Sequence, residues 1–64
     1  MKNNLKKLRE SKGLSQEKLG DNLGVSRQTI NSIENGKFDP SLTLAIKLTK
    51  FFDEPIDSNF ELEN

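Results

Sequence analysis

The segment Val-Ser-Arg-Gln-Thr-Ile-Asn-Ser-Ile-Glu-Asn-Gly, residues 25–36, most strongly limits what this chain can fold into. Ser26 is a favourable N-cap and Gly36 a favourable stop, so the sequence predicts a short helix between them. Ile30 and Ile33 lie one turn apart and can face a core. The other side of the helix is polar and carries Arg27, Gln28, Thr29, Asn31 and Ser32. Arg, Asn and Gln match base edges in the major groove of DNA, provided that the rest of the chain holds the helix in place.

The length and composition narrow the function classes. The 64 residues form one small domain, residues 1–64, near the size at which a hydrophobic core is barely sufficient. The sequence contains neither Cys nor His, which removes disulfides, thiolate metal sites and the usual general base. We therefore expect no enzyme activity, no cofactor and no metal site. No apolar run approaches a membrane span of about 18 residues and no signal peptide is apparent, so we expect a cytoplasmic protein without membrane contact.

The zero net charge hides a gradient along the chain. Residues 1–37 hold eight Lys or Arg against four Asp or Glu, a net charge of +4, whereas residues 38–64 hold two against six, a net charge of −4. A basic half can approach phosphates while the acidic half faces away. The alternative is a solvated surface on which the charges segregate by chance.

Three further helices are expected from caps and periodicity. One lies within residues 3–12, with Asn3 or Asn4 as cap. A second begins after Ser15 and runs to about Leu23, and another runs from Ser41 to about residue 52 or 53. A last helical turn is expected over residues 55–59, and residues 60–63 alternate as in a short strand or a frayed tail. The prediction is an all-α, compact bundle of four to five short helices, with a strand at the C-terminus as an option.

The helix expected after Ser41 is apolar nearly all round, which is more than one core face requires. In so small a domain the second burial can be against another copy of the chain. The residues that could serve either the core or such a dimer interface are Leu44, Phe51, Phe60 and Leu62.

Residues 16–35 read as two short helices joined at Leu23-Gly24-Val25. The apolar residues that two crossed helices would bury together are Leu19, Leu23, Val25, Ile30 and Ile33. Gly20 is small where the two helices would approach most closely, and Gly24 permits a turn that a Cβ would penalise. This spacing predicts a helix-turn-helix, whose second helix enters the major groove.

Several motifs resemble the Cro/C1-type (XRE-like) helix-turn-helix regulators of bacteria, archaea and phages, in particular their short single-domain members. The matching motifs are Leu14-Ser15-Gln16, Gly24-Val25-Ser26, Ile30, Ile33-Glu34-Asn35-Gly36 and Pro40-Ser41-Leu42. The resemblance spans about residues 4–59. The chain departs from the family at Gly20 and Thr49, where alanine is usual.

The resemblance implies a role for individual residues. Gln16 would contact a phosphate, Arg27 and Gln28 would read bases, and Ser32 would be a third reader. Asn35 and Lys37 would clamp phosphates, and Arg9 and Glu34 would form an ion bridge. Together with the polar face, the candidate DNA-binding residues are Gln16, Ser26, Arg27, Gln28, Thr29, Asn31, Ser32, Asn35 and Lys37. Each could instead be an ordinary solvated side chain.

We expect a sequence-specific, dimeric regulator of transcription, acting as a repressor, with a recognition helix at about residues 26–34. Two copies would bind a pseudo-palindromic operator, and the protein would be nucleoid-associated when bound. Because the sequence shows no second domain that could bind an inducer, the activity of the regulator would be controlled by its own abundance or by a regulatory partner protein. Two alternatives stay open: the antitoxin of a toxin–antitoxin pair, and a protein-interaction module without DNA affinity. Binding by such an interaction module would not change on replacing Arg27 or Gln28 by alanine.

Overall fold

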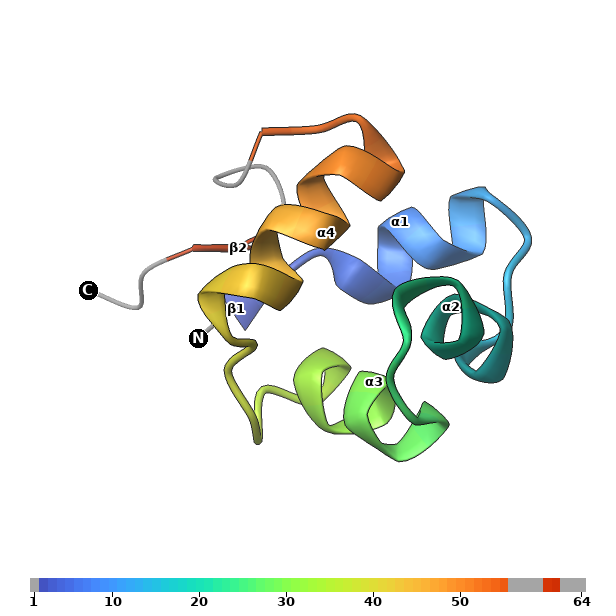
Figure 1. Ribbon diagram of the computed structural model, residues 1–64, viewed down its shortest axis with the longest axis horizontal. Helices are drawn as coiled ribbons and strands as arrows, with labels where there is room; N and C mark the ends of the chain where they lie inside the picture. The colour runs from blue at the N-terminus through green and yellow to red at the C-terminus, as the bar shows by residue number, and fades with distance from the viewer. Residues whose placement is uncertain (1, 56–59, 62–64) are drawn as a thin grey trace.

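The computed structural model describes residues 2–55 and 60–61, which form four short helices and one small sheet (Figure 1). The elements in chain order are β1 (Lys2–Asn3), α1 (Leu5–Ser11), α2 (Gln16–Leu23), α3 (Arg27–Glu34), α4 (Leu42–Phe52) and β2 (Phe60–Glu61). The helices pack around a single core, with α2 and α3 crossing through a short turn. This confirms the all-α fold with a helix-turn-helix, and the strand at the C-terminus is a minor addition.

Three helices begin at a serine N-cap, as the sequence predicts. The side-chain oxygens of Ser15, Ser26 and Ser41 accept hydrogen bonds from the backbone N–H three residues further on, at 3.0, 3.1 and 3.1 Å. Each bond satisfies one of the free amide groups of a first helical turn. These local bonds mark the starts of α2, α3 and α4 at the positions that the sequence predicts.

The turn between α2 and α3 depends on two glycines. Gly24 ends α2 in the left-handed conformation, with φ of +76°, which an L side chain adopts at a penalty. Gly20 lies where the turn comes back over α2, and a Cβ built there would be 2.6 Å from the carbonyl oxygen of Val25. The close approach expected at Gly20 is therefore present.

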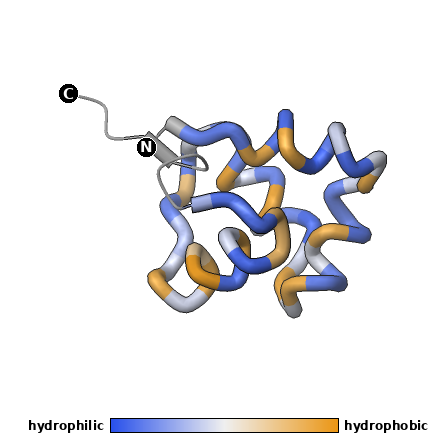
Figure 2. The backbone as a smooth tube through the Cα atoms, turned by 90° about the horizontal axis from the view of Figure 1, so that it is seen from above, coloured by the Kyte–Doolittle hydropathy of each residue, from blue (hydrophilic) through white to orange (hydrophobic). Residues whose placement is uncertain are grey.

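The core takes one apolar side from each helix, and in Figure 2 the helical segments alternate between blue and orange stretches for this reason. Its buried members are Leu5, Leu19, Leu23, Ile30, Ile33, Leu44, Ala45, Leu48 and Phe52. Around them pack the partly buried Leu8, Leu14, Val25 and Phe51. All five residues expected to meet between the crossed helices thus belong to this core or its edge.

Helix α4 has a buried face and an exposed apolar face. Leu44 is only 7% exposed within its own chain and belongs to the core, which is one of the two roles expected of it, and its role at a dimer interface stays a prediction. Leu42 and Ile46 are instead 73% and 45% exposed. The ring of Phe51 is half-buried and packs edge-on against Phe52, with ring centroids 5.0 Å apart.

The ends of the described chain meet in a sheet that the sequence did not predict in full. β1 and β2 are antiparallel, with Lys2 opposite Glu61 and Asn3 opposite Phe60. Of the two cap candidates, Asn4 is the N-cap residue of α1 but its side chain makes no capping hydrogen bond. The Asn3 side chain instead accepts a hydrogen bond from the N–H of Leu5 at 3.1 Å. The helical turn expected over residues 55–59 falls almost entirely on residues 56–59, which lie outside the described residues, as do the side chain of Phe60 and the whole of Leu62, so the interface roles of these two residues stay predictions.

Candidate nucleic-acid interface

Helix α3 presents a polar face because its two isoleucines are held in the core. Ile30 and Ile33 are completely buried. Arg27, Gln28 and Asn31 on the other side are exposed. The face predicted from the sequence is thus open to a ligand, and the side chains on it carry the donors and acceptors that base edges require.

The angle between α2 and α3 is fixed by backbone contacts at their junction. The N–H groups of Gly24 and Val25 both donate to the carbonyl of Gly20, in the second case at 2.9 Å. Because Gly20 has no side chain, the backbone of the turn at Val25 and Ser26 lies directly against α2. A rigid junction of this kind holds α3 in one orientation relative to α2.

A buried ion pair joins α1 to the last residue of α3. The Nε and Nη2 atoms of Arg9 donate to the two carboxylate oxygens of Glu34 at 2.7 and 3.3 Å. The two side chains are 11% and 3% exposed. The hydrogen bond to Glu34 is the main cause that raises the pKa of Arg9 above its usual value, so the guanidinium stays charged. This is the bridge that the resemblance implied, and it anchors the end of α3.

Gln16 extends this network to the polar face. Its Nε2 atom donates to Glu34 at 3.0 Å and to the Oδ1 atom of Asn31 at 3.2 Å. A side-chain amide has two N–H groups, so both are used inside the protein. The side chain of Gln16 therefore orients Asn31, a role that the sequence did not reveal because its partners lie 15 and 18 residues further along the chain, on another helix.

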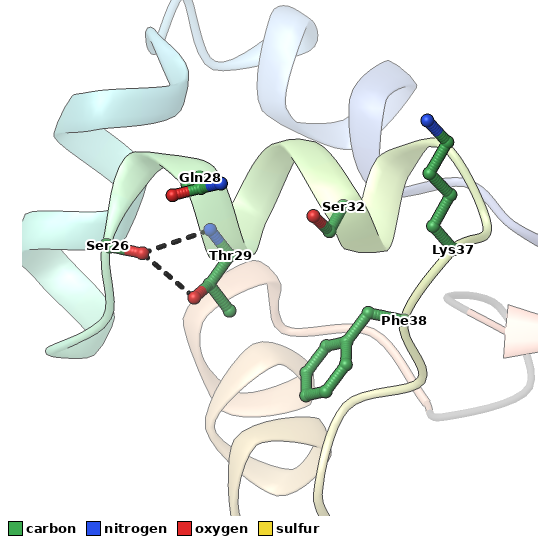
Figure 3. Close-up of a pocket in the computed structure, with 6 residues that line it drawn as sticks. All are labelled: Ser26, Gln28, Thr29, Ser32, Lys37 and Phe38. Carbon is green, nitrogen blue, oxygen red and sulfur yellow. Dashed lines mark hydrogen bonds between the residues drawn. The ribbon is translucent and has the colours of Figure 1, made fainter.

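A hollow of about 360 Å³ lies against α3 and the loop that follows it (Figure 3). Its lining residues are Ser26, Gln28, Thr29, Ser32, Lys37 and Phe38. Five of these were candidates from the sequence. Phe38 was not predicted as part of this surface. Its place in the turn between Gly36 and Pro40 was a usable signal, because an aromatic residue in a turn is not on the core face of a helix.

Two further candidate residues, Asn35 and Lys37, lie at the C-terminal end of α3 and in the loop that follows it. Asn35 is the C-cap of α3 and is exposed. Lys37 is also exposed, and its N–H donates to the carbonyl of Ser32 at 2.9 Å, which holds the loop against the helix. Its ammonium group extends along the end of α3 in Figure 3. An exposed cation in this position can reach an anionic backbone that runs past the helix.

Two further findings on the described part of the chain concern metal-binding clusters and membrane-spanning helices. Among residues 2–55 and 60–61, no three acidic side chains gather closely enough to hold a metal ion. None of the helices in this part of the chain is sufficiently long and apolar to cross a lipid bilayer.

Comparison with known proteins places these features in a family. The helix-turn-helix family model matches residues 5–59. The uncharacterised HTH-type transcriptional regulator MJ0272 of Methanocaldococcus jannaschii is 55% identical over 64 residues, covering 100% of this chain and 97% of the relative. The uncharacterised HTH-type transcriptional regulator YgzD of Bacillus subtilis is 51% identical over 63 residues, covering 98% and 96%.

A solved structure agrees in fold. The restriction-modification controller protein C.AhdI from Aeromonas hydrophila superposes with a TM-score of 0.76 at 34% identity, over 86% of this chain and 83% of that one. Family model, relatives and fold all point to DNA-binding regulators of transcription rather than to enzymes. The chain belongs to the Cro/C1-type helix-turn-helix family of transcriptional regulators.

Proposed function

We propose that this chain binds a specific double-stranded DNA operator as a dimer and represses transcription by occupying it. The observation that carries the proposal is the contrast between the two sides of α3. One side is held in the core by the buried isoleucines and by the Arg9–Glu34 bridge. On the other side Arg27, Gln28 and Asn31 are exposed. A rigid helix with an uncovered polar face is suited to direct reading of bases.

In this proposal some of the exposed residues contact bases and others contact phosphates. Arg27 and Gln28 read bases at the start of α3, and Asn31 and Ser32 read one turn further on. Lys37 and Asn35 contact phosphates and set the register. The Gln16 side chain supports Asn31, so its own phosphate contact would have to come from the backbone N–H at the start of α2. The net charge of +4 on residues 1–37 supplies the attraction to the DNA backbone.

The proposed dimer rests on the exposed apolar face of α4. Leu42 and Ile46 lie one helical turn apart and are both exposed. Beside Ile46 is a surface hollow of about 560 Å³ that ends at Pro55. A second copy that covers this face could place its recognition helix in the next major groove, about 34 Å away.

The dimer can be tested by sedimentation. Ile46→Lys puts a charge on the proposed interface, so the variant should sediment as a monomer at concentrations where the wild type is dimeric. It should also lose cooperative binding to a two-half-site operator. If the wild type stays monomeric at micromolar concentration, both free and on DNA, the α4 interface is wrong.

Selection of bound sequences from a random DNA pool, at one stated salt concentration, tests specific binding. The wild type should enrich a two-fold symmetric motif, and Arg27→Ala should weaken binding to it by about 5- to 150-fold, the equivalent of 1–3 kcal/mol. Lys7→Ala is the matched control, because it removes one exposed positive charge from the same basic half of the chain but lies on α1, outside both α3 and the proposed dimer interface.

Two outcomes would contradict the proposal. Failure to enrich any motif would leave only non-specific attraction by a basic surface. Equal binding by wild type and Arg27→Ala would favour a protein-interaction module. Repression itself is measured with a reporter gene under a promoter that contains the selected motif: expression should fall when the protein is present and recover with Arg27→Ala.

A further inference from the structure

The hollow beside α3 has one apolar wall. The hydroxyl of Thr29 is engaged with that of Ser26 at an O–O distance of 2.9 Å. This bond turns the methyl group of Thr29 away from the N-cap, toward the side of α3 on which Phe38 lies (Figure 3). The methyl group and the aromatic ring thus line the hollow together.

Phe38 is half exposed, with 51% of its surface accessible. Its ring is not part of the core, and Phe38 lines both the hollow on α3 and a second one of about 260 Å³ against the start of α4. The loop is held in place by the bond from the Lys37 N–H to the Ser32 carbonyl, at 2.9 Å. An aromatic ring therefore lies at the edge of the polar surface of α3, on a loop that is held against the helix.

The rest of the hollow is polar. Gln28 and Ser32 contribute an amide and a hydroxyl from α3, and Lys37 contributes a positive charge at the margin. In the major groove thymine displays a methyl group beside the O4 acceptor, whereas the other three bases display only donors and acceptors. The combination of an apolar wall with nearby donors matches the thymine edge better than the edges of the other three bases, which offer no methyl group to the wall.

We propose that this hollow receives a thymine of the operator, with the thymine methyl group against Phe38 and Thr29. Ser32 or Gln28 donates to O4, and Lys37 contacts a neighbouring phosphate. Phe38 is then a specificity-determining residue that lies outside the recognition helix. The inference rests on the proposed function, since it requires specific binding in the major groove.

The test removes the methyl group from the DNA rather than from the protein. Each thymine of the selected operator is replaced in turn by deoxyuridine, and the dissociation constant is measured by fluorescence anisotropy at fixed salt. For the wild type, one thymine in each half-site should show about a fourfold loss of affinity, the worth of one buried methyl group at about 0.8 kcal/mol. Phe38→Ala should bind the thymine and uracil operators equally.

Two variants serve as controls. Phe38→Tyr keeps the ring and should keep the fourfold ratio. Lys37→Ala should weaken binding to both operators by the same factor and also keep the ratio, because a phosphate contact does not depend on the base. Each ratio compares two DNAs with one protein preparation, so partial unfolding of a variant cancels.

The outcomes separate the two proposals. If the wild type binds its operator specifically but no thymine is sensitive to loss of its methyl group, or if Phe38→Ala keeps the full ratio, the role of Phe38 is wrong and specific DNA binding stands. If no motif is enriched from the random pool, the proposed function fails and this inference falls with it.

Discussion

Replacing Arg9 by methionine should reveal how strongly the ion bridge stabilises the fold. The change leaves the Glu34 carboxylate, whose side chain is 3% exposed, without the guanidinium 2.7 Å away. Removing one partner of a buried pair costs about 3–5 kcal/mol. The carbonyl of Leu14 also loses its donor at 2.6 Å. A chain of 64 residues has roughly 3–10 kcal/mol of stability at about 0.05–0.15 kcal/mol per residue. We therefore expect Arg9→Met to remove much of the stability, or all of it.

The assay is urea unfolding followed by far-UV circular dichroism, arranged as a double-mutant cycle. Arg9→Met/Glu34→Leu leaves no buried charge and should be more stable than Arg9→Met by at least about 1 kcal/mol. Lys7→Met is the matched control on the same helix: Lys7 is exposed, and its replacement should change stability by less than about 0.5 kcal/mol.

Two results would refute this reasoning. A loss below about 1 kcal/mol for Arg9→Met would mean that the pair behaves like an exposed surface ion pair. A double variant no more stable than Arg9→Met would mean that the unpaired carboxylate is not the source of the loss.

Three further changes test local features. Gly20→Ala should lower stability by about 1 kcal/mol in urea unfolding, because crowding of a Cβ 2.6 Å from the Val25 carbonyl oxygen outweighs the gain in helix propensity. Ser26→Ala should lower the unfolding free energy by about 1 kcal/mol and also weaken operator binding, since the methyl group of Thr29 loses its orientation. Asp53→Gly should raise the thermal midpoint, by the equivalent of roughly 1 kcal/mol, because Asp53 ends α4 with φ of 54°.

The helices could be predicted because their signals are local. A serine cap and a following glycine or proline act within a few residues, so the starts of α2, α3 and α4 and the end of α2 agree with the sequence. The polar face of α3 was predictable for the same reason, since the positions of Ile30 and Ile33 determine which residues point away from the core.

The pairing of β1 with β2 was not predictable. Each strand has two residues, too few for an alternating pattern to be recognised, and the partners come from opposite ends of the described chain. A side-chain bond from the Nδ2 atom of Asn3 to the carbonyl of Ile33, at 2.8 Å, helps to hold this end of the chain, and nothing in the local sequence indicates it.

Helix α4 shows why an apolar segment does not reveal its own orientation. Leu42, Leu44 and Ile46 are equally apolar, yet only Leu44 is buried, because packing against the rest of the core determines which side of the helix faces inward. The roles of Gln16 and Phe38 were missed for a related reason. Both depend on residues that neighbour them only in the folded chain.

Whether α3 reads bases is measured by parallel selection with wild type and Gln28→Ala. Both proteins are presented with the same random DNA pool at one salt concentration. We predict that Gln28→Ala enriches the same motif with the preference lost at one base pair in each half-site, and with affinity lower by the equivalent of about 1–3 kcal/mol. An unchanged motif, or an equal weakening on every sequence, would contradict the claim that α3 reads bases.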